Sequence, residues 1–325
     1  MCPTGALSVQ DSNYIGTPAK TVDSICGFCA VGCALEIGVF GNKVVEVNPA
    51  GRMDSINRST LCVRGHFAND YLNSSKRLLS PMLRNGQDKT DAKMTSVSWE
   101  QAIDTVADRL TKTARTNGPQ SIAFIGSAKA SVEENYLLQK IARTAIGTNN
   151  IDYGSYVSGR ALQTFVDRRT GGRWRTAPLS ALERAEAIVL FGADPSHTLP
   201  VVSYYIKRAV KSGVPLVVAD PRRTEMARMA AHWLPVAPGG DLPLINALAA
   251  MLLANGSYDA TFVDRYTEGF SVYRMGLSGI DPISEAGSVG IKPEALEAVA
   301  GLLDGKRISW IAGSGLTRQH NRTHA

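Results

Sequence analysis

Four cysteines near the start of this 325-residue chain have the type and spacing of a metal-ligand set. They lie in "SICGFCAVGCALEIG" and "STLCVRGHF", with gaps of two, three and 28 residues. Three thiolates from one tight loop can reach three corners of an iron–sulfur cubane, and a distant fourth can close it. We therefore predict a [4Fe–4S] cluster held by Cys26, Cys29, Cys33 and Cys62.

A structural zinc site is the alternative interpretation, and unliganded thiols are a further one. Zinc sites commonly combine two C-x2-C knuckles or mix Cys with His, which the three-residue second gap fits poorly. Gly27 and Gly32 allow the loop to bend so that amide N–H groups point toward the sulfurs, which tunes the potential of a cluster. The residues between the cysteines are mostly apolar and would exclude water.

The fifth cysteine, Cys2, is part of "MCPTGALSV". The ligand run of two-cluster bacterial ferredoxins, C-x2-C-x2-C-x3-C-P, ends in the same Cys-Pro pair. Because the three preceding cysteines are missing, we expect no cluster at Cys2. We interpret residues 1–17 as the remnant of an upstream ferredoxin-type module.

Composition limits the partners. A net charge of +6 and a pI near 9.1 favour an anionic partner, such as a phosphate-bearing cofactor, an acidic subunit or nucleic acid. Nucleic acid is disfavoured because basic and aromatic residues are not interleaved in the way such surfaces require. No apolar run reaches the roughly 20 residues of a membrane span, and no signal peptide is recognisable. We expect a cytoplasmic protein with no disulfide scaffold.

We predict that the cysteine-rich segment, residues 18–75, forms a small domain. The helices and strands of the rest of the chain follow it. "SWEQAIDTVADRLTKTARTNG" predicts a helix with Ser98 and Gln101 as a capping box, an apolar buried face and Gly118 as its end. "SVEENYLLQKIARTAIG" predicts a second helix with Ser131 and Glu134 as its box. "LPLINALAAMLLANG" predicts a buried helix.

Four apolar runs that end in turn residues alternate with these helices. Such runs predict a parallel sheet covered on both faces, and ligands bind such sheets beyond the carboxyl ends of the strands. The segment Ala187–Asp220 is the clearest strand–helix–strand unit. The runs are "SIAFIGSA", "AIVLFGADP", "PLVVADPRR" and "ISWIAGSG", and they place Gly126, Gly192–Asp194, Asp220–Arg223 and Gly313–Gly315 at one edge. We predict a nucleotide-type ligand there.

Three features together carry a resemblance to a known family: the spacing of the cysteines, "LCVRG" and "VVADPRRTEMARMAAHWLPVAPGGDLPLINAL". With them the chain resembles the molybdopterin oxidoreductases, above all formate dehydrogenase large subunits and the related large subunit of NADH:quinone oxidoreductase. The resemblance implies an α/β fold: a small [4Fe–4S] domain, then a doubly wound, mostly parallel, Rossmann-like cofactor domain over residues 76–325. We expect that domain to be incomplete at the C-terminus, because "AGSGLTRQHNRTHA" resembles the beginning of a Gly-x-Gly-x-Thr-Gln-His turn.

The resemblance also implies a molybdenum or tungsten bis-(molybdopterin guanine dinucleotide) cofactor, and it assigns residues to it. Arg64 stands where the family usually has Lys between cluster and pterin, and it keeps the positive charge with a planar fork in place of a point charge. The nucleotide-binding positions are Gly192, Asp194, Asp220, Arg222, Arg223, Gly240, Asp241 and Gly315. Among them, carboxylates suit guanine or ribose, and guanidinium groups suit pyrophosphate.

The metal-ligand position departs from the formate dehydrogenase pattern. Aligning "GTNNIDYGSYVSGRAL" puts Ser158 where those enzymes carry Cys or selenocysteine, and Gly159 where they carry His. Ser158 could bind the metal as an alkoxide, as a serine does in the dimethyl sulfoxide reductase branch. Alternatively the metal site is lost, and the missing ligand and histidine together favour the loss of formate chemistry.

Two functions follow. The first is an iron–sulfur/molybdopterin oxidoreductase subunit, similar to formate dehydrogenase, that transfers electrons between a pterin-side active site and a ferredoxin-type relay. The alternative is a non-catalytic relay or structural subunit of an NADH:acceptor or quinone oxidoreductase complex. Either would have other iron–sulfur and flavin subunits as partners. A basic zinc protein that binds nucleic acid is the remaining interpretation.

Overall fold

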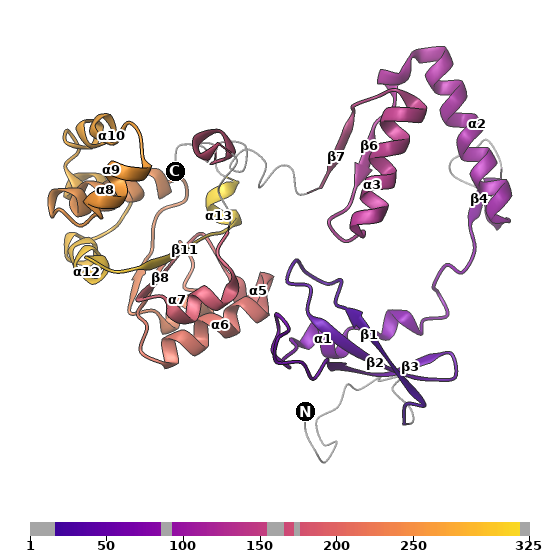
Figure 1. The fold of residues 1–325 in the computed structure, drawn as a ribbon, viewed down its shortest axis with the longest axis horizontal. Helices are drawn as coiled ribbons and strands as arrows, with labels where there is room; N and C mark the ends of the chain where they lie inside the picture. The colour runs from indigo at the N-terminus through magenta and orange to yellow at the C-terminus, as the bar shows by residue number, and fades with distance from the viewer. Residues whose placement is uncertain (1–16, 86–92, 155–165, 172–175, 319–325) are drawn as a thin grey trace. The chain divides into compact units, whose positions relative to one another are not determined.

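The chain forms two compact units, Met1–Tyr156 and Val157–Ala325 (Figure 1). A computed structural model describes residues 17–85, 93–154, 166–171 and 176–318. None of the helices within those ranges combines the length and the apolarity needed to cross a bilayer.

The first unit begins with a three-stranded antiparallel sheet in the order β1-β2-β3. A two-residue loop joins β2 to β3, and Gly41 supplies the positive φ (57°) that the first position of such a loop requires. Leu35, Val45 and Val47 bury one face of the sheet. The bounds are β1 (Lys20–Ile25), β2 (Ala34–Phe40), β3 (Lys43–Pro49), the helix α1 (Val63–Phe67) and the 3-10 turn η1 (Asp70–Leu72).

The rest of the first unit contains two helices and two small sheets. Its elements are β4 (Met82–Asn85), β5 (Lys93–Ser96), α2 (Trp99–Asn117), η2 (Pro119–Ser121), β6 (Phe124–Gly126), α3 (Val132–Lys140), η3 (Ile141–Ile146) and β7 (Ile151–Tyr153). Strands β4 and β5 pair antiparallel, and β6 and β7 pair parallel.

The predicted helix N-caps form, with three differences. Ser98 accepts a hydrogen bond from the Gln101 N–H at 3.1 Å, which is the N-cap half of the predicted capping box, whereas Ser131 and Glu134 form a complete box. The second helix ends in a π-helical turn, η3, that the sequence did not predict. Helix α2 buries none of its residues, so the expected buried face is wrong for the described structure.

The expectation that "SIAFIGSA" joins the main sheet is also wrong. Its strand, β6, pairs only with β7 in a separate two-stranded sheet. Gly126 therefore does not share an edge with the other predicted strand ends. The reason is that strand composition predicts burial but does not specify which strand is the neighbour.

The second unit contains a four-stranded parallel sheet in the order β10-β9-β8-β11. All five residues of β8 and all four of β9 are buried, as expected for strands covered on both faces. The strand β10 was not predicted. The bounds are β8 (Ala187–Phe191), β9 (Leu216–Ala219), β10 (His232–Leu234) and β11 (Ile308–Ala312).

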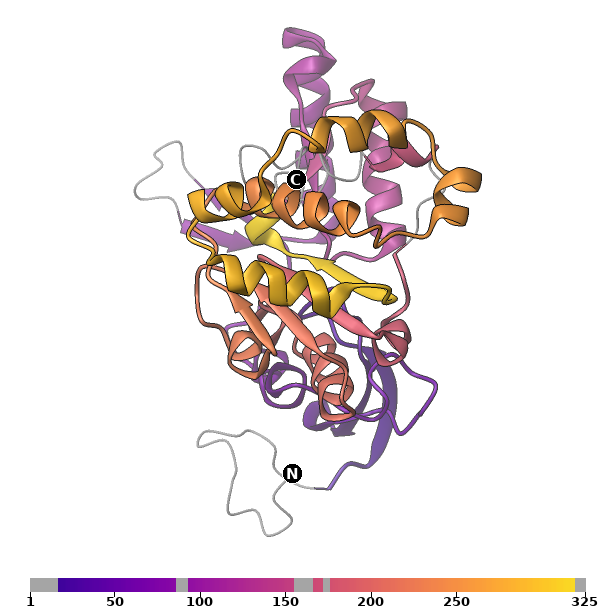
Figure 2. The same cartoon turned by 90° about the vertical axis from the view of Figure 1, so that its left-hand side faces the viewer.

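Helices cover both faces of this sheet (Figures 1 and 2). Val189 and Phe191 of β8 belong to one core with Leu244 and Leu248 of α8 and with α12, so the alternate residues of β8 face the side of α6. The bounds are η4 (Leu179–Arg184), α5 (Pro195–Thr198), α6 (Pro200–Lys211), α7 (Glu225–Met229), α8 (Asp241–Ala254), α9 (Ala260–Tyr266), α10 (Phe270–Leu277), α11 (Pro282–Ser288), α12 (Pro293–Leu303) and α13 (Ser314–Thr317).

The connections make the sheet doubly wound. The chain runs from β8 through α5 and α6 to β9 and through α7 to β10, and then returns through α8–α12 to β11, on the other side of β8. The winding direction therefore reverses between β8 and β11. In such folds the ligand crevice lies at this reversal, beyond the carboxyl ends of the strands. The predicted α/β class with a small first domain and a doubly wound parallel sheet is confirmed.

Candidate cluster and cofactor site

The four predicted cluster cysteines lie in the three-stranded part of the first unit as free thiols. Cys26, Cys33 and Cys62 are buried, and Cys29 is half-buried. The Cys26 N–H donates to the Cys33 carbonyl at 2.8 Å, so the loop between them closes on itself. Gly32, at φ 63°, provides the left-handed residue that this closure needs.

At two of these thiols, Cys26 and Cys33, the surroundings disfavour the negatively charged thiolate. Burial and, to a smaller extent, the neighbouring cysteines together raise the pKa of Cys33 to about 12. Burial also raises the pKa of Cys26, which the Phe28 backbone N–H and the charge of Arg64 oppose. A bound metal would favour the deprotonated forms of Cys26 and Cys33, which these two pKa shifts disfavour in its absence. Among the described residues no group of three or more His, Cys, Asp or Glu side chains is placed to hold a single metal ion.

The predicted bridging residue Arg64 lies on α1, directly after the segment that carries Cys62. It is half-buried, and its charge acts on the Cys26 thiol. Gly65 follows it, and a Cβ at Gly65 would lie 3.7 Å from the Cys26 sulfur. A larger side chain there would occupy the space beside the sulfur, so Gly65 lets the helix backbone approach the site.

Asn57 is a structural residue of this site that the sequence reasoning missed. It is 1% exposed, accepts a hydrogen bond from the Ala34 N–H at 2.8 Å and donates to the carbonyls of Ala34 and Thr60. These bonds tie the turn before Cys62 to the strand that begins directly after Cys33. The turn also contains Arg58 and Ser59 at positive φ. An Asn at the start of a turn is common, so its sequence gives no hint of a partner 23 residues away.

The second site lies where the sheet reverses direction. The Gly313 N–H donates to the Phe191 carbonyl at 2.8 Å, and the Gly315 N–H donates to the Gly192 carbonyl at 2.9 Å. A Cβ at Gly192 would lie 2.6 Å from the Leu316 nitrogen, and one at Gly315 would lie 2.8 Å from the Gly192 Cα. The two turns therefore touch through their backbones, and only glycine permits this approach.

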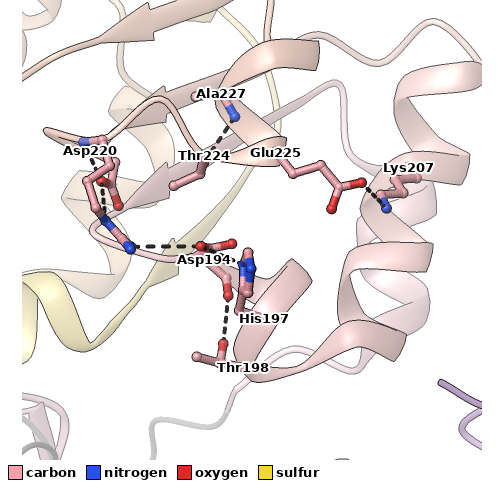
Figure 3. Close-up of polar contacts among 9 residues, drawn as sticks. Asp194, His197, Thr198, Lys207, Asp220, Thr224, Glu225 and Ala227 are labelled. Atoms are coloured by element: carbon pink, nitrogen blue, oxygen red, sulfur yellow. Dashed lines mark hydrogen bonds and ion pairs between the residues drawn. The ribbon is translucent and has the colours of Figure 1, made fainter. Parts of the chain in front are cut away.

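Two acidic residues and one arginine surround this point (Figure 3). The Arg222 Nη2 lies 3.7 Å from Asp194 Oδ2, and the Arg222 Nε lies 3.6 Å from Asp220 Oδ1. The Arg222 backbone N–H also donates to Asp220 Oδ1 at 2.8 Å. The arginine thus lies between two carboxylates that are nine-tenths buried or more. Arg223 points elsewhere, over the Trp233 ring.

Asp194 retains unused hydrogen-bonding capacity. Its Oδ2 lies 3.0 Å from His197 Nδ1, whereas its buried Oδ1 has no hydrogen-bond partner among the described residues. The neighbouring Ser196 hydroxyl is also buried, and after Lys207 its hydrogen bond to the Glu225 carboxylate contributes to the lowered pKa of that group. A buried polar atom without a partner is costly, so Asp194 Oδ1 is suited to a ligand that supplies an N–H or O–H donor.

The remaining predicted positions are placed as follows. Gly240 and Asp241 form the start of α8, which follows β10, and Asp241 is buried. A Cβ at Gly240 would lie 2.7 Å from Val289, so this turn also has no room for a side chain. Ser158 and Cys2 lie outside the described residues, so their predicted roles stay predictions.

A set of four thiols in the first unit and a doubly wound parallel sheet in the second are the features of an iron–sulfur protein with a Rossmann-like domain. Residues 19–74 match the family model described as "Molybdopterin oxidoreductase Fe4S4 domain", and residues 77–325 match "Molybdopterin oxidoreductase". The chain therefore belongs to the molybdopterin oxidoreductase family, as the sequence motifs indicated.

Individual relatives agree with this assignment. The chain is 30% identical over 305 residues to formate dehydrogenase H of Escherichia coli (strain K12), covering 92% of this chain and 42% of the relative. It is 32% identical over 324 residues to the NADPH-Fe(3+) oxidoreductase subunit alpha of Geobacter sulfurreducens (strain DL-1 / KN400), covering 98% and 37%. The chain thus spans less than half the length of these relatives.

A solved structure shares the fold. Acetylene hydratase from Pelobacter acetylenicus superposes with a TM-score of 0.80 at 21% identity, covering 94% of this chain and 42% of that chain.

The residues present fit both groups that the family implies. Four thiols, three of them buried, are of the type and number that a [4Fe–4S] cluster needs as ligands. The unpartnered Asp194 Oδ1, at the carboxyl end of β8 where the sheet reverses, fits a nucleotide, which needs an acceptor for its N–H or O–H groups. The zinc interpretation is not supported, because residues 19–74 match an Fe4S4 domain.

Proposed function

We propose that this chain supplies the [4Fe–4S] cluster and the first nucleotide-binding domain of a molybdopterin oxidoreductase. It would transfer electrons between a pterin-side active site and a ferredoxin-type relay. The observation that carries the proposal is the presence in one chain of a four-thiol set and of an unpartnered buried carboxylate oxygen, Asp194 Oδ1, at the point where the sheet reverses direction.

The side chains divide the work between binding and charge balance. Cys26, Cys29, Cys33 and Cys62 would bind a cluster, which supplies one-electron transfer when present. The Phe28 N–H donates to the Cys26 sulfur, and Arg64 adds positive charge beside it, so both stabilise the electron-rich form.

At the second site, Asp194 and Asp220 would accept hydrogen bonds from the nucleotide portion of a molybdenum or tungsten bis-(molybdopterin guanine dinucleotide). Arg222 neutralises these two carboxylates in the structure, and its side chain is 70% exposed. It is therefore free to turn toward a pyrophosphate when a ligand takes over the carboxylates. Gly192 and Gly315 let the turns after β8 and β11 pack directly against each other, which brings the carboxyl ends of the two strands together.

The partners we propose are other redox subunits that carry iron–sulfur clusters or flavin. The name of one relative, NADPH-Fe(3+) oxidoreductase subunit alpha, describes a subunit of a larger redox complex. The net charge of +6 suits acidic partners of this kind.

A second candidate function has its own observation. Ser158 and Gly159 replace the Cys or selenocysteine and the His of the formate dehydrogenase pattern. We therefore propose, as the alternative, a relay subunit that retains the cluster but has lost the metal-dependent step.

Cofactor analysis of the anaerobically purified native complex tests the proposal. The first function predicts about four iron and four acid-labile sulfide per chain, together with pterin and molybdenum or tungsten. Cys29→Ser should remove most of the cluster absorbance, whereas Cys2→Ser, the matched control, should retain it. Stoichiometric zinc without sulfide would refute both functions.

Reduction of a dye by formate separates the two candidates. Activity that Ser158→Ala abolishes, and the neighbouring Ser155→Ala retains, would support Ser158 as a metal ligand and refute the relay function. A complex with a full cluster but neither pterin nor metal would establish the relay function instead.

A further inference from the structure

The two oxygens of the Asp194 carboxylate have different surroundings. The side chain is 10% exposed, and its Oδ2 lies 3.0 Å from Nδ1 of His197, three residues further along the chain. A carboxylate only accepts hydrogen bonds, so the proton of this contact is on Nδ1. The buried Oδ1 has no hydrogen-bond partner among the described residues. His197 therefore determines which of the two oxygens can meet a donor from a ligand.

The short helix α5 fixes the backbone of His197 beside Asp194 (Figure 3). Pro195 begins this helix, where its ring restricts φ, and is buried. The N–H groups of His197 and Thr198 donate to the Asp194 carbonyl at 3.2 and 3.1 Å, and the Thr198 hydroxyl donates to it at 2.9 Å. The His197 side chain itself is 78% exposed. The imidazole thus bonds to Asp194 without being part of a core.

Arg222 is a competing partner for the same carboxylate. Its Nη2 lies 3.7 Å from Asp194 Oδ2, which is longer than a hydrogen bond, and its side chain is 70% exposed. A guanidinium group commonly binds both oxygens of a carboxylate at once. Because the His197 imidazole already bonds to Oδ2, Arg222 makes only the longer contact, and Oδ1 keeps its capacity to accept.

Glu225 of α7 is a second carboxylate within electrostatic reach of His197. It is bonded to Lys207 of α6, whose Nζ lies 2.6 Å from Glu225 Oε1. This ion pair leaves the imidazole to Asp194, the carboxylate to which its Nδ1 is bonded.

We propose that His197 is a positioning residue of the nucleotide site and acts through Asp194. By holding Oδ2, it presents Oδ1 to an N–H or O–H donor of the nucleotide and leaves Arg222 available for a phosphate. The inference rests on the proposed nucleotide-binding function and adds to it a residue that contacts no ligand atom. It also explains why an exposed imidazole is bonded to a buried carboxylate.

Binding of guanosine diphosphate to the 325-residue chain, measured by isothermal titration calorimetry, tests the proposal. His197→Ala should weaken binding about tenfold, because the Asp194 carboxylate can then turn toward Arg222. His197→Asn should stay within about twofold of the wild type, because the Asn amide donates in place of Nδ1. Met275→Ala on α10, 70% exposed in the same unit, is the control and should leave binding unchanged.

A double-mutant cycle shows whether His197 acts through Asp194. In an Asp194→Ala background, His197→Ala should weaken binding by less than about a further twofold. An undiminished effect in that background would mean that His197 contacts the ligand itself, and it would overturn the proposal. Asp194→Asn provides the same comparison if the alanine variant does not fold, which circular dichroism shows.

The remaining outcomes separate this inference from the proposed function. A wild-type chain that binds guanosine diphosphate equally well with His197→Ala would overturn the positioning role and leave the nucleotide site in place. A loss that His197→Asn does not restore would overturn the role of the Nδ1 bond. A folded wild-type chain that does not bind guanosine diphosphate would refute the proposed nucleotide site, and the inference with it.

Discussion

Gly192→Ala is the sharpest test of the contact between the turns after β8 and β11, because it adds one methyl group where they touch. The new Cβ would lie 2.6 Å from the Leu316 nitrogen and 2.8 Å from the Gly315 Cα, both backbone atoms that cannot rotate away. Gly192 also has φ 53°, which costs a non-glycine residue about 1 kcal/mol. Overpacking against a rigid neighbour adds about 1–3 kcal/mol to this cost, so we expect Gly192→Ala to lower the free energy of unfolding by about 3 kcal/mol.

Gly269→Ala is the matched control. Gly269 has a comparable φ of 77° in the same unit, but no other group lies within 4 Å of its Cβ position. Gly269→Ala should therefore lower the free energy of unfolding by only about 1 kcal/mol, which is the effect of the unfavourable φ alone. The difference between the two variants isolates the contact between the turns.

Urea unfolding of the cluster-free chain measures both variants. Far-UV circular dichroism and the fluorescence of Trp233 and Trp310 follow the second unit, and the free energies are compared at constant m-value. Equal losses for Gly192→Ala and Gly269→Ala would refute the close approach. A loss at Gly192 below about 1 kcal/mol would refute it as well.

Three further predictions concern the first unit. Asn57→Ala should lower the free energy of unfolding by about 2–4 kcal/mol and lower cluster retention, because it leaves backbone groups of Ala34 and Thr60 without partners. Urea unfolding measures the first effect and visible absorbance the second, and an unchanged urea midpoint would contradict this role. In the cluster-free chain Cys33 should be alkylated about a thousandfold more slowly at pH 8 than a thiol of pKa 9, because the pKa of Cys33 is about 12. The alkylation rate should rise with pH up to about 12, and rapid modification at pH 8 would contradict the effect of burial on this pKa. Ser131→Ala should lower stability by about 1 kcal/mol through the lost capping box, whereas Ser131→Thr should retain most of it; thermal unfolding measures both.

Local patterns in the sequence predicted the elements whose stability is decided locally. The Ser131–Glu134 capping box and the strand–helix–strand unit from Ala187 to Asp220 both form as predicted. Apolar composition also predicted correctly that β8 and β9 are covered on both faces. These features depend on residues within one turn or one strand of each other, and the sequence shows them directly.

Features that depend on distant partners could not be predicted. The three-residue strand β10 has no apolar run of its own and forms because β9 offers an edge. The strand β6 has the composition of a central strand but pairs only with β7. The bonds of Asn57 to Ala34 and the contact of Gly192 with Gly315 arise from chain closure over many residues, which no local pattern records.

The contact between β8 and β11 also has a consequence for the order of events during synthesis. The N–H of Arg307 donates to the Glu186 carboxylate, 121 positions earlier in the chain, at the start of the β8–β11 pair. Such a non-local pair closes late, because the entropy of a long loop must be overcome first. The contact between the turns after β8 and β11 therefore does not exist on a nascent chain that stops before β11.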